Sequence, residues 1–199
     1  VTLDPVRYLG RALSAWDPSA GFGRIQNQAA GYLFPMGPFF AIGQALGIAP
    51  WITQRLWIGT LLIAGYWGAN RLARALGVAT VAGRVVAGLA YTLSAATLGV
   101  VAFQSAGQLP YAMAPWVLVP LVGADARLGP RRAAALSGLA IAAMGGVNGA
   151  STLAVLPLVA VWFTTRTPGR DRCRFMTWWA GSAVAATVWW VVALGVSVR

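Results

Sequence analysis

The sequence has no lysine, no glutamate, no histidine and a single cysteine, Cys173. Without histidine and with one thiol, the chain cannot supply a Cys–His zinc site, a Ser–His–Asp or Cys–His catalytic group, or an internal disulfide. A general base would therefore have to come from one of the carboxylates. The chain has four of these, Asp4, Asp17, Asp125 and Asp171.

Charge is scarce and almost all of one sign. Charged residues make up 10% of the 199 residues, apolar residues make up 58%, and fifteen arginines give a net charge of +11. A soluble domain has about 25% charged residues, so this composition indicates a membrane protein. The arginines lie in short clusters between apolar runs, which is typical of membrane topology rather than of nucleic-acid binding. We therefore expect no nucleic-acid partner.

The apolar runs are long enough to predict about six membrane spans. They cover 51–70, 85–103, 109–124, 133–147, 150–165 and 175–196. Three prolines in the third run predict a kink, and the glycine-rich joint at 145–149 predicts a tight turn. The predicted fold class is an all-α polytopic membrane protein. The chain starts without Met and ends just after an apolar run, so we expect a segment of a longer protein.

The arginines alternate between the connections. Loops 71–84, 125–132 and 166–174 hold ten arginines, whereas 104–108 and 145–149 hold no charge. The positive-inside rule places the arginine loops in the cytoplasm and the uncharged loops outside. The arginine loops could also hold anionic lipid headgroups or an acidic cytoplasmic protein.

Residues 33–50 allow two readings. They could form a seventh span, which would put residues 1–32 in the cytoplasm, and the arginines of 1–32 favour that reading. They could instead lie at the membrane surface or re-enter it, which would leave 1–32 outside. Pro35 and Pro38 favour this second reading because they disturb the entry turn. The residues alone do not decide between the two.

Residues 3–16 have the pattern of a short amphipathic helix that begins after Asp4 and Pro5. Asp4 is a candidate general base, and it is also a good helix N-cap, the commoner role of Asp before Pro at a helix start. Asp17 is a weaker candidate base because the Asp17-Pro18 pair is typical of a turn.

Uncharged polar and aromatic side chains are candidates for binding a sugar, because amides both donate and accept hydrogen bonds and aromatic rings stack on sugar rings. The candidates are Gln26, Asn27, Gln28, Tyr32, Gln104, Gln108 and Asn148. Each also has a structural reading, as part of a polar loop or as a partner of neighbouring helices. Arg55, near a helix start, could reach the membrane interface or bind a phosphate.

Several motifs together resemble one family. They are LDP at 3–5, YLGRAL at 8–13, WDP at 16–18, FG at 22–23, QNQA at 26–29 and GYLFPMGPFF at 31–40. This pattern resembles the amino-terminal membrane region of the mycobacterial α-(1→3)-arabinofuranosyltransferases of the GT-C class. The resemblance implies a GT-C-like transmembrane bundle at 51–199. It also implies an extracytoplasmic loop of short helices at 1–50, with residues 33–50 at the surface or re-entrant.

The resemblance also implies the chemistry. The donor would be decaprenyl-phosphate arabinofuranose and the acceptor cell-wall arabinan, in arabinogalactan or lipoarabinomannan, outside the plasma membrane. Transfer would invert the anomeric centre while a carboxylate takes the acceptor proton. Asp4 would be the base, and Arg7, Arg11 and Arg55, or a divalent cation, would steady the departing phosphate. Further acidic residues are expected upstream of Val1, so the segment alone is expected to be inactive.

Two other classes remain open. A lipid or solute transporter or flippase is favoured by the interrupted helices at 109–124 and 145–149. A scaffold could bind an acidic cytoplasmic protein, such as an acyl carrier protein, through the arginine loops.

Overall fold

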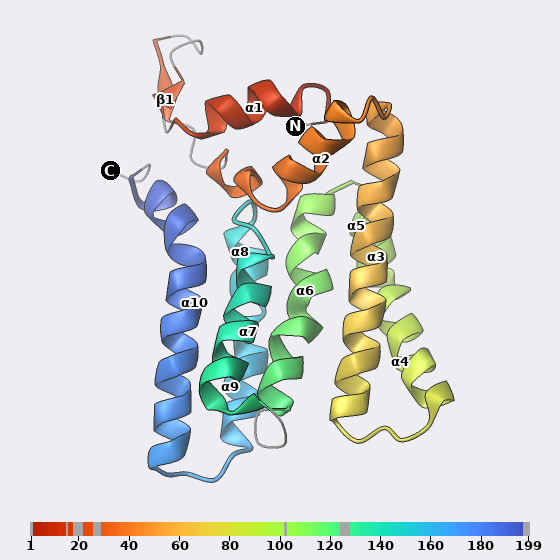
Figure 1. Cartoon of the computed structure of the whole chain (residues 1–199), viewed down its shortest axis with the longest axis vertical. Coiled ribbons are helices and arrows are strands. Elements are labelled where there is room, and N and C mark those ends of the chain that lie inside the picture. The colour runs from red at the N-terminus through yellow and green to blue at the C-terminus, as the bar shows by residue number, and fades with distance from the viewer. Residues whose placement is uncertain are drawn as a thin grey trace.

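The computed structural model describes residues 2–14, 16–17, 22–25, 29–101, 103–123 and 128–196. Over these residues the prediction of an all-α fold is confirmed: a bundle of helices carries two shorter helices across one of its ends (Figure 1). The crossing helices are α1 (Pro5–Ala12) and α2 (Met36–Ala45), with η1 (Ala30–Leu33) just before α2. Two strands of two residues each, β1 (Trp16–Asp17) and β2 (Arg24–Ile25), pair antiparallel beside α1.

The bundle is built around one central helix. Its members are α3 (Pro50–Ala75), α4 (Val81–Thr92), α5 (Ala95–Val101), α6 (Ser105–Val122), α7 (Pro130–Ala142), α8 (Gly149–Leu153), α9 (Leu156–Thr164) and α10 (Arg170–Val196). Helix α6 packs against α3 and α5 on one side and against α7, α8 and α9 on the other. Two apolar clusters share it, one with α2, α3 and α5 and the other with α7, α9 and α10.

Helix α6 contains Pro110, Pro115 and Pro120 and still continues as one helix of 18 residues. Because Pro115 has no N–H, the carbonyl of Tyr111 loses its normal partner one turn later. The hydroxyl of Tyr91, on α4, donates to this carbonyl at 2.7 Å. The two tyrosine rings also stack, with centroids 4.3 Å apart. A neighbouring helix thus satisfies the backbone group that the proline leaves unpaired, as a membrane interior requires.

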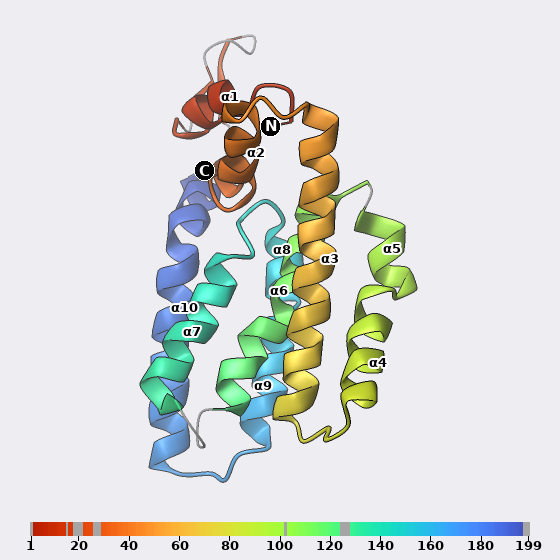
Figure 2. The ribbon, with the colours of Figure 1, turned by 45° about the vertical axis from the view of Figure 1, so that its right-hand side comes forward.

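The run 85–103, expected as one span, is divided between two helices. Helix α4 ends at Thr92, α5 begins at Ala95, and the two are bent by 45° (Figure 2). Ser94 lies at the break, and its hydroxyl accepts from the N–H of Thr97 at 3.4 Å, as a helix cap does. The carbonyl of Tyr91 at the break accepts from the hydroxyls of Thr97 and Tyr111, both at 3.4 Å.

The expected run 150–165 is also divided, between α8 and α9. Pro157 lies in the first turn of α9, where its missing N–H favours a helix start and opposes continuation from α8. Helix α7 has 13 residues, fewer than the roughly 20 that a straight span needs. The run 133–147 is therefore shorter as a helix than predicted.

Length and hydropathy single out few helices as spans. In the described part of the chain, Arg170–Ala193 of α10 meets both criteria, and the bent α4–α5 pair would be a second span if it counts as one. Helix α3 has 26 residues, about 39 Å at 1.5 Å per residue, which is long enough to cross a bilayer. It also carries Arg55, Arg71 and Arg74, which lower its hydropathy. The layout with six spans stays a prediction.

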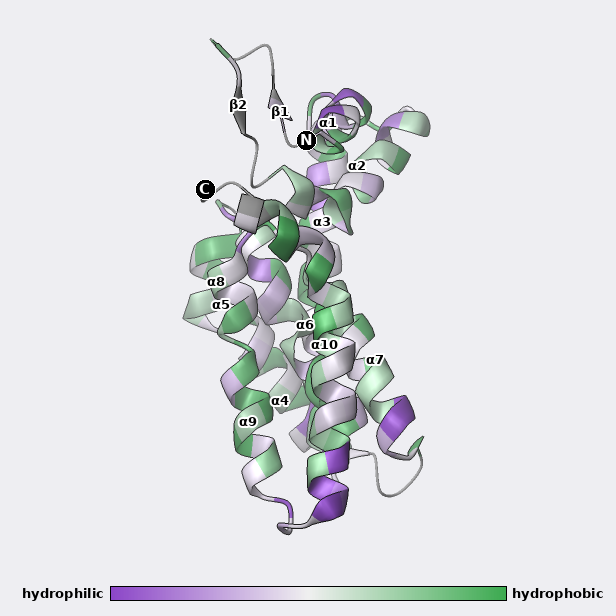
Figure 3. Ribbon diagram, turned by 90° about the vertical axis from the view of Figure 1, so that its left-hand side faces the viewer, coloured by the Kyte–Doolittle hydropathy of each residue, from purple (hydrophilic) through white to green (hydrophobic). Residues whose placement is uncertain are grey.

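The two ends of the bundle differ in charge. The connections from α3 to α4 and from α9 to α10 lie at the end away from α1 and α2, together with the end of α6 and the start of α7 (Figure 1). Hydrophilic residues gather at that end of α7 and α10, and the middle of the bundle is largely apolar (Figure 3).

Helix α2, with ten residues, spans about 15 Å and cannot cross a bilayer core of about 30 Å. Residues 36–45 therefore do not form a seventh span.

Candidate functional site

An open cavity of about 620 Å³ lies at the end of the bundle that carries α1 and α2. Its lining comes from the residues before α1, from η1 and the start of α2, from the start of α3, and from the connections from α5 to α6 and from α7 to α8. The volume lies within the range of about 300–1,000 Å³ that small-molecule sites occupy. We call it the upper cavity.

The upper cavity is polar and uncharged among the described residues that line it. Its polar side chains are Thr2, Tyr32, Gln54, Gln104, Ser105 and Asn148. Amides and hydroxyls both donate and accept hydrogen bonds, so this lining suits the hydroxyl groups of a sugar better than an anion. Nothing in the described lining would neutralise a phosphate.

Three of the predicted sugar-binding residues meet here, from three separate segments. Tyr32 comes from η1, Gln104 precedes α6, and Asn148 precedes α8. Asn148 also caps α8, because its Oδ1 accepts from the N–H of Ser151 at 3.1 Å. Gln104 makes no capping hydrogen bond with its side chain. The positions agree with a sugar site, although the sugar contacts themselves stay a prediction.

Gln54, in the first turns of α3, is a lining residue that sequence reasoning missed. Its Oε1 is buried and has no hydrogen-bond partner among the described residues. An unpaired buried acceptor costs about 1–3 kcal/mol, so such a group in a cavity calls for a donor from a ligand or water. In the sequence, Gln54 is a polar residue near the start of a largely apolar run. It stands directly before Arg55, whose charge makes it more conspicuous.

Three glycines, Gly31, Gly145 and Gly146, allow η1 to pack closely against the connection from α7 to α8. The N–H of Gly146 donates to the carbonyl of Gly31 at 3.4 Å, and a Cβ on Gly31 would overlap the backbone of Gly146 and Val147. Gly145 adopts a positive φ of 68°, which L side chains rarely tolerate. The turn predicted at 145–149 is therefore the surface against which η1 packs. Asn148, within that turn, lines the cavity.

Two tyrosine rings pack against each other where α1 meets η1. The rings of Tyr8 and Tyr32 meet edge to face with centroids 5.5 Å apart. Burial raises the pKa of Tyr32, and burial followed by the nearby Tyr32 raises the pKa of Tyr8. The raised pKa values keep both hydroxyls protonated to a higher pH than usual, and Tyr32 lines the cavity as a hydrogen-bond donor.

Asp4 lies outside the lining of the upper cavity. It is exposed and caps α1, with Oδ1 accepting from the N–H of Arg7 at 3.1 Å, while Pro5 occupies the first helical position. Thr2, two residues earlier, does line the cavity. The structure therefore gives Asp4 the capping role that competes with catalysis, and its role as a base stays a prediction.

The predicted phosphate-binding arginines also lie outside the lining. Arg7 and Arg11 are exposed and one turn apart on α1, so they share a face of that helix. Arg55 is exposed on α3, where its guanidinium lies 4.7 Å from the centre of the Trp51 ring. The stack agrees with an interfacial position for Arg55.

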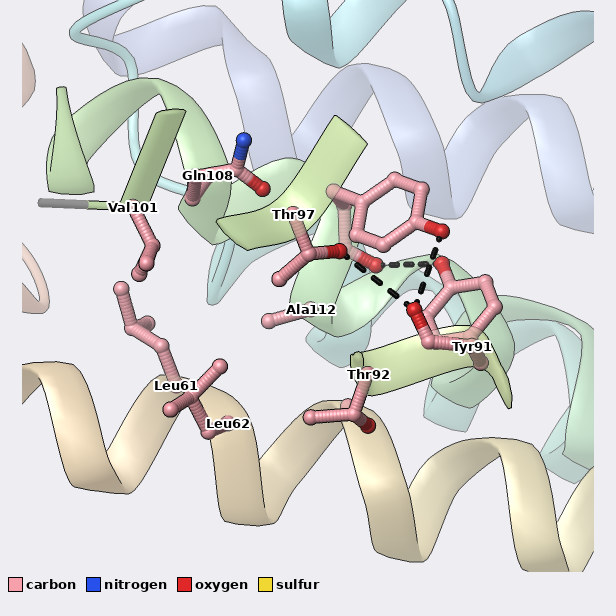
Figure 4. A pocket seen from close by; sticks show the side chains of 10 residues that line it. Leu61, Leu62, Tyr91, Thr92, Thr97, Val101, Gln108 and Ala112 are labelled. Atoms are coloured by element: carbon pink, nitrogen blue, oxygen red, sulfur yellow. Dashed lines mark hydrogen bonds between the residues drawn. The ribbon is translucent and has the colours of Figure 1, made fainter. Parts of the chain in front are cut away.

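Gln108 lies apart from the upper cavity. It lies in a different and much smaller space of about 10 Å³, among residues of α3, α4, α5 and α6 (Figure 4). Its Nε2 donates to the carbonyl of Ala96 at 3.2 Å, and the residue is buried. Gln108 thus links α6 to α5, its Oε1 has no hydrogen-bond partner among the described residues, and a sugar contact by it stays a prediction.

Other predicted site residues are less completely described. Gln26, Asn27 and Gln28 lie outside the described residues. Asp17 pairs with Arg24 in the register of β1 and β2. In the described part of the chain, no three acidic or thiol side chains gather into a metal-binding group, and a divalent cation stays a prediction.

The fold and the sequence match one family over the whole chain. The model of the family described as Alpha-(1->3)-arabinofuranosyltransferase, N-terminal GT-C domain, matches residues 1–199. The chain belongs to this GT-C domain family. It is 44% identical over 198 residues to the alpha-(1->3)-arabinofuranosyltransferase of Mycobacterium tuberculosis, and 42% identical over 195 residues to that of Mycolicibacterium smegmatis. Each match covers 98% of this chain.

The similarity to this GT-C domain extends to three dimensions. The cryo-EM structure of arabinofuranosyltransferase AftD from mycobacteria superposes with a TM-score of 0.90 at 44% sequence identity, over 97% of this chain and 15% of that one. The resemblance inferred from residues 3–40 is thereby confirmed, as is the GT-C-like fold. The chain spans 14% of the length of each curated relative.

Proposed function

We propose that this chain is part of a membrane glycosyltransferase that moves arabinofuranose from decaprenyl-phosphate to cell-wall arabinan, in arabinogalactan or lipoarabinomannan. Membership in the GT-C domain family supports the class of reaction. The upper cavity is the observation that carries the proposal for this chain. It is large enough for a sugar and lined by neutral donors and acceptors, and it lies at the end opposite the arginine connections.

In this proposal the sugar lies in the upper cavity and the phosphate lies outside it. Gln54, Gln104 and Asn148 bind the ring hydroxyls, and the buried Oε1 of Gln54 accepts from one of them. The phosphate needs cations, which the described lining lacks. Arg7, Arg11 and Arg55 are the candidates in this chain, on the helices that surround the cavity.

Transfer proceeds with inversion, and a carboxylate takes the proton of the acceptor hydroxyl as it attacks the anomeric carbon. The phosphate of the donor leaves with the bonding electrons, so the leaving group needs cations rather than an acid. Asp4 is the candidate base in the described chain, although its cap geometry competes with that role.

The proposal is tested by Gln54→Leu in the full-length enzyme, assayed in membranes with labelled decaprenyl-phosphate arabinofuranose and an arabinan acceptor. We expect kcat/KM to fall about tenfold, the value of one lost hydrogen bond of about 1.4 kcal/mol. Gln44→Leu is the matched control, because Gln44 is exposed on the nearby α2 and does not line the cavity. Equal rates for the two variants would reject the cavity as the sugar site.

The proposed location is the plasma membrane, with residues 1–50 outside and the arginine connections in the cytoplasm. The excess of arginine at one end supports this orientation. A cysteine placed by Gly10→Cys in a Cys173→Ser background tests it, since position 10 is exposed and has open space for a side chain. Labelling of intact cells by an impermeant thiol reagent is expected, whereas labelling only after permeabilisation would reverse the orientation. An acidic cytoplasmic partner such as an acyl carrier protein stays a prediction.

A further inference from the structure

A second open cavity, of about 410 Å³, lies at the arginine-bearing end of the bundle. It is formed between the start of α7 and the start of α10, and its lining includes Arg131, Arg132, Arg174, Asp171 and Trp178. We call it the lower pocket. It is separate in lining and position from the upper cavity, and the proposed sugar transfer does not use it.

The lower pocket concentrates positive charge. Three guanidinium groups face one carboxylate, which leaves an excess of two positive charges in the lining. In the part of the chain that the structure describes, Arg132 and Arg174 have no hydrogen-bond or ion-pair partner and both are exposed. Arginine binds phosphate with two parallel hydrogen bonds, so this lining suits a phosphate group.

The backbone adds to this field. Helix α7 begins at Pro130 and α10 begins at Arg170, so two helices of 13 and 27 residues both present their N-terminal ends to the lower pocket. Unpaired N–H groups and the helix dipole favour an anion at such ends. The helix ends alone would not define a ligand, but they act in the same direction as the three arginines.

The rest of the lining is apolar and continues along both helices. The ring of Trp178 lies under Arg131, with the guanidinium 4.5 Å from the ring centre. Leu136 and Leu139 follow Arg132 on one exposed face of α7, at the spacing of successive helical turns. On α10, Trp178 follows Arg174 by one turn, and Val188 lies two heptads after Arg174.

A charged pocket that opens onto exposed apolar stripes suits an amphiphilic anion. We propose that the lower pocket binds the phosphate headgroup of an anionic phospholipid, with the acyl chains along the exposed faces of α7 and α10. A free phosphate would use the arginines but not the apolar stripes. An acidic protein would need a broad charged surface rather than a pocket between two helices. Basic pockets between membrane helices recognise anionic headgroups in this way.

The test measures lipid retention by the full-length protein in a neutral detergent, by native mass spectrometry with phosphatidylglycerol or phosphatidylcholine. We expect phosphatidylglycerol to be retained in preference, and Arg132→Gln with Arg174→Gln to weaken its binding about tenfold. Arg74→Gln with Arg84→Gln is the matched control. It removes the same charge from the same end of the bundle but lies outside the pocket. Arg132→Lys with Arg174→Lys keeps the charge but loses the paired hydrogen bonds, so its binding should fall between that of the unchanged protein and that of the glutamine pair.

Several outcomes would overturn the proposal. An equal loss in the control pair would mean that charge at this end acts without a pocket. Undiminished binding in the pocket pair would place the lipid elsewhere. Equal retention of phosphatidylcholine would remove the headgroup preference, and full displacement by millimolar inorganic phosphate would identify a site for the free anion. Capture of an acidic protein by the pocket without any lipid binding would assign the surface to that partner.

Discussion

We expect the hydrogen bond from the Tyr91 hydroxyl to the carbonyl of Tyr111 to stabilise the bundle, because it pairs the acceptor that Pro115 leaves without a backbone donor. Tyr91→Phe keeps the ring that stacks at 4.3 Å and removes only the hydroxyl that donates at 2.7 Å. The carbonyl is then unpaired, because Pro115 has no N–H to offer it. An unsatisfied buried acceptor costs about 1–3 kcal/mol, and hydrogen bonds between membrane helices contribute about 0.6–1.7 kcal/mol. We expect a loss of about 1–2 kcal/mol.

If the unpaired carbonyl of Tyr111 is the cause, the loss of stability from Tyr91→Phe must depend on Pro115. Pro115→Ala restores a backbone N–H that can reach the carbonyl of Tyr111, so Tyr91→Phe should cost about 1 kcal/mol less in that background. Hydrogen exchange of the full-length protein measures the effect as faster opening of peptides from α4 to α6, about fivefold to thirtyfold for Tyr91→Phe alone. Tyr66→Phe is the control, because the hydroxyl of Tyr66 has no hydrogen-bond partner among the described residues. Equal losses in the backgrounds with and without this proline would refute the account.

Three further predictions concern the end that carries α1 and α2. Gly31→Ala should weaken the docking of η1 by about 1–3 kcal/mol because the new Cβ overlaps the backbone of Gly146, whereas Gly10→Ala, in open space on α1, should not; limited proteolysis of the two variants compares them. Asp4→Asn keeps a good helix cap and removes the base, so arabinosyl transfer should fall by orders of magnitude if Asp4 is catalytic; near-normal transfer would leave it as a cap. The raised pKa values of Tyr8 and Tyr32 stabilise the docked state fully below a pH of about 10, and this stabilisation should be lost as the pH rises further. Hydrogen exchange of residues 29–34 between pH 8 and 11 checks this, and Tyr8→Phe with Tyr32→Phe should abolish the dependence.

Local rules predicted those parts of the fold that depend on neighbouring residues. The start of α1 follows from Asp4 as a cap and Pro5 at the first helical position, and both act within one turn. The breaks at Ser94 and Pro157 were missed because hydropathy averages over a window in which one cap or one proline has little weight. In addition, the break at Ser94 is stabilised by Tyr111, which is 17 residues away, so its partners are set by tertiary packing.

In the candidate site, the residue types could be read from the sequence, but their positions in the fold could not. Gln104 and Gln108 are one turn apart and equally polar, yet Gln104 lines the upper cavity while Gln108 is buried against α5. Their chemistry predicts that each needs hydrogen bonds, but only the arrangement of α5 and α6 decides from where. Gln54 was missed for the converse reason, because an amide on a membrane helix is ordinarily paired with a neighbour. Its unpaired oxygen becomes visible only when η1 and the connections around α6 and α8 enclose it.

Because the described lining of the upper cavity is uncharged, we expect different residues to recognise the sugar and the phosphate of the donor. A sugar hydroxyl is neutral, and neutral amides recognise it at little desolvation cost, whereas a phosphate and a proton acceptor both require charge. In the described residues the charged positions of this end lie outside the lining, at Asp4, Arg7 and Arg11 on or beside α1, at Arg55 on α3, and at Asp17 and Arg24 on β1 and β2. Substitutions in the cavity should therefore change the selectivity among sugars, measured as the ratio of kcat/KM for arabinofuranosyl and other pentosyl donors. Substitutions of the outer arginines should instead weaken all phosphate donors alike. If Gln54→Leu and Arg55→Gln reduced every donor by the same factor, recognition of sugar and phosphate would not be divided in this way.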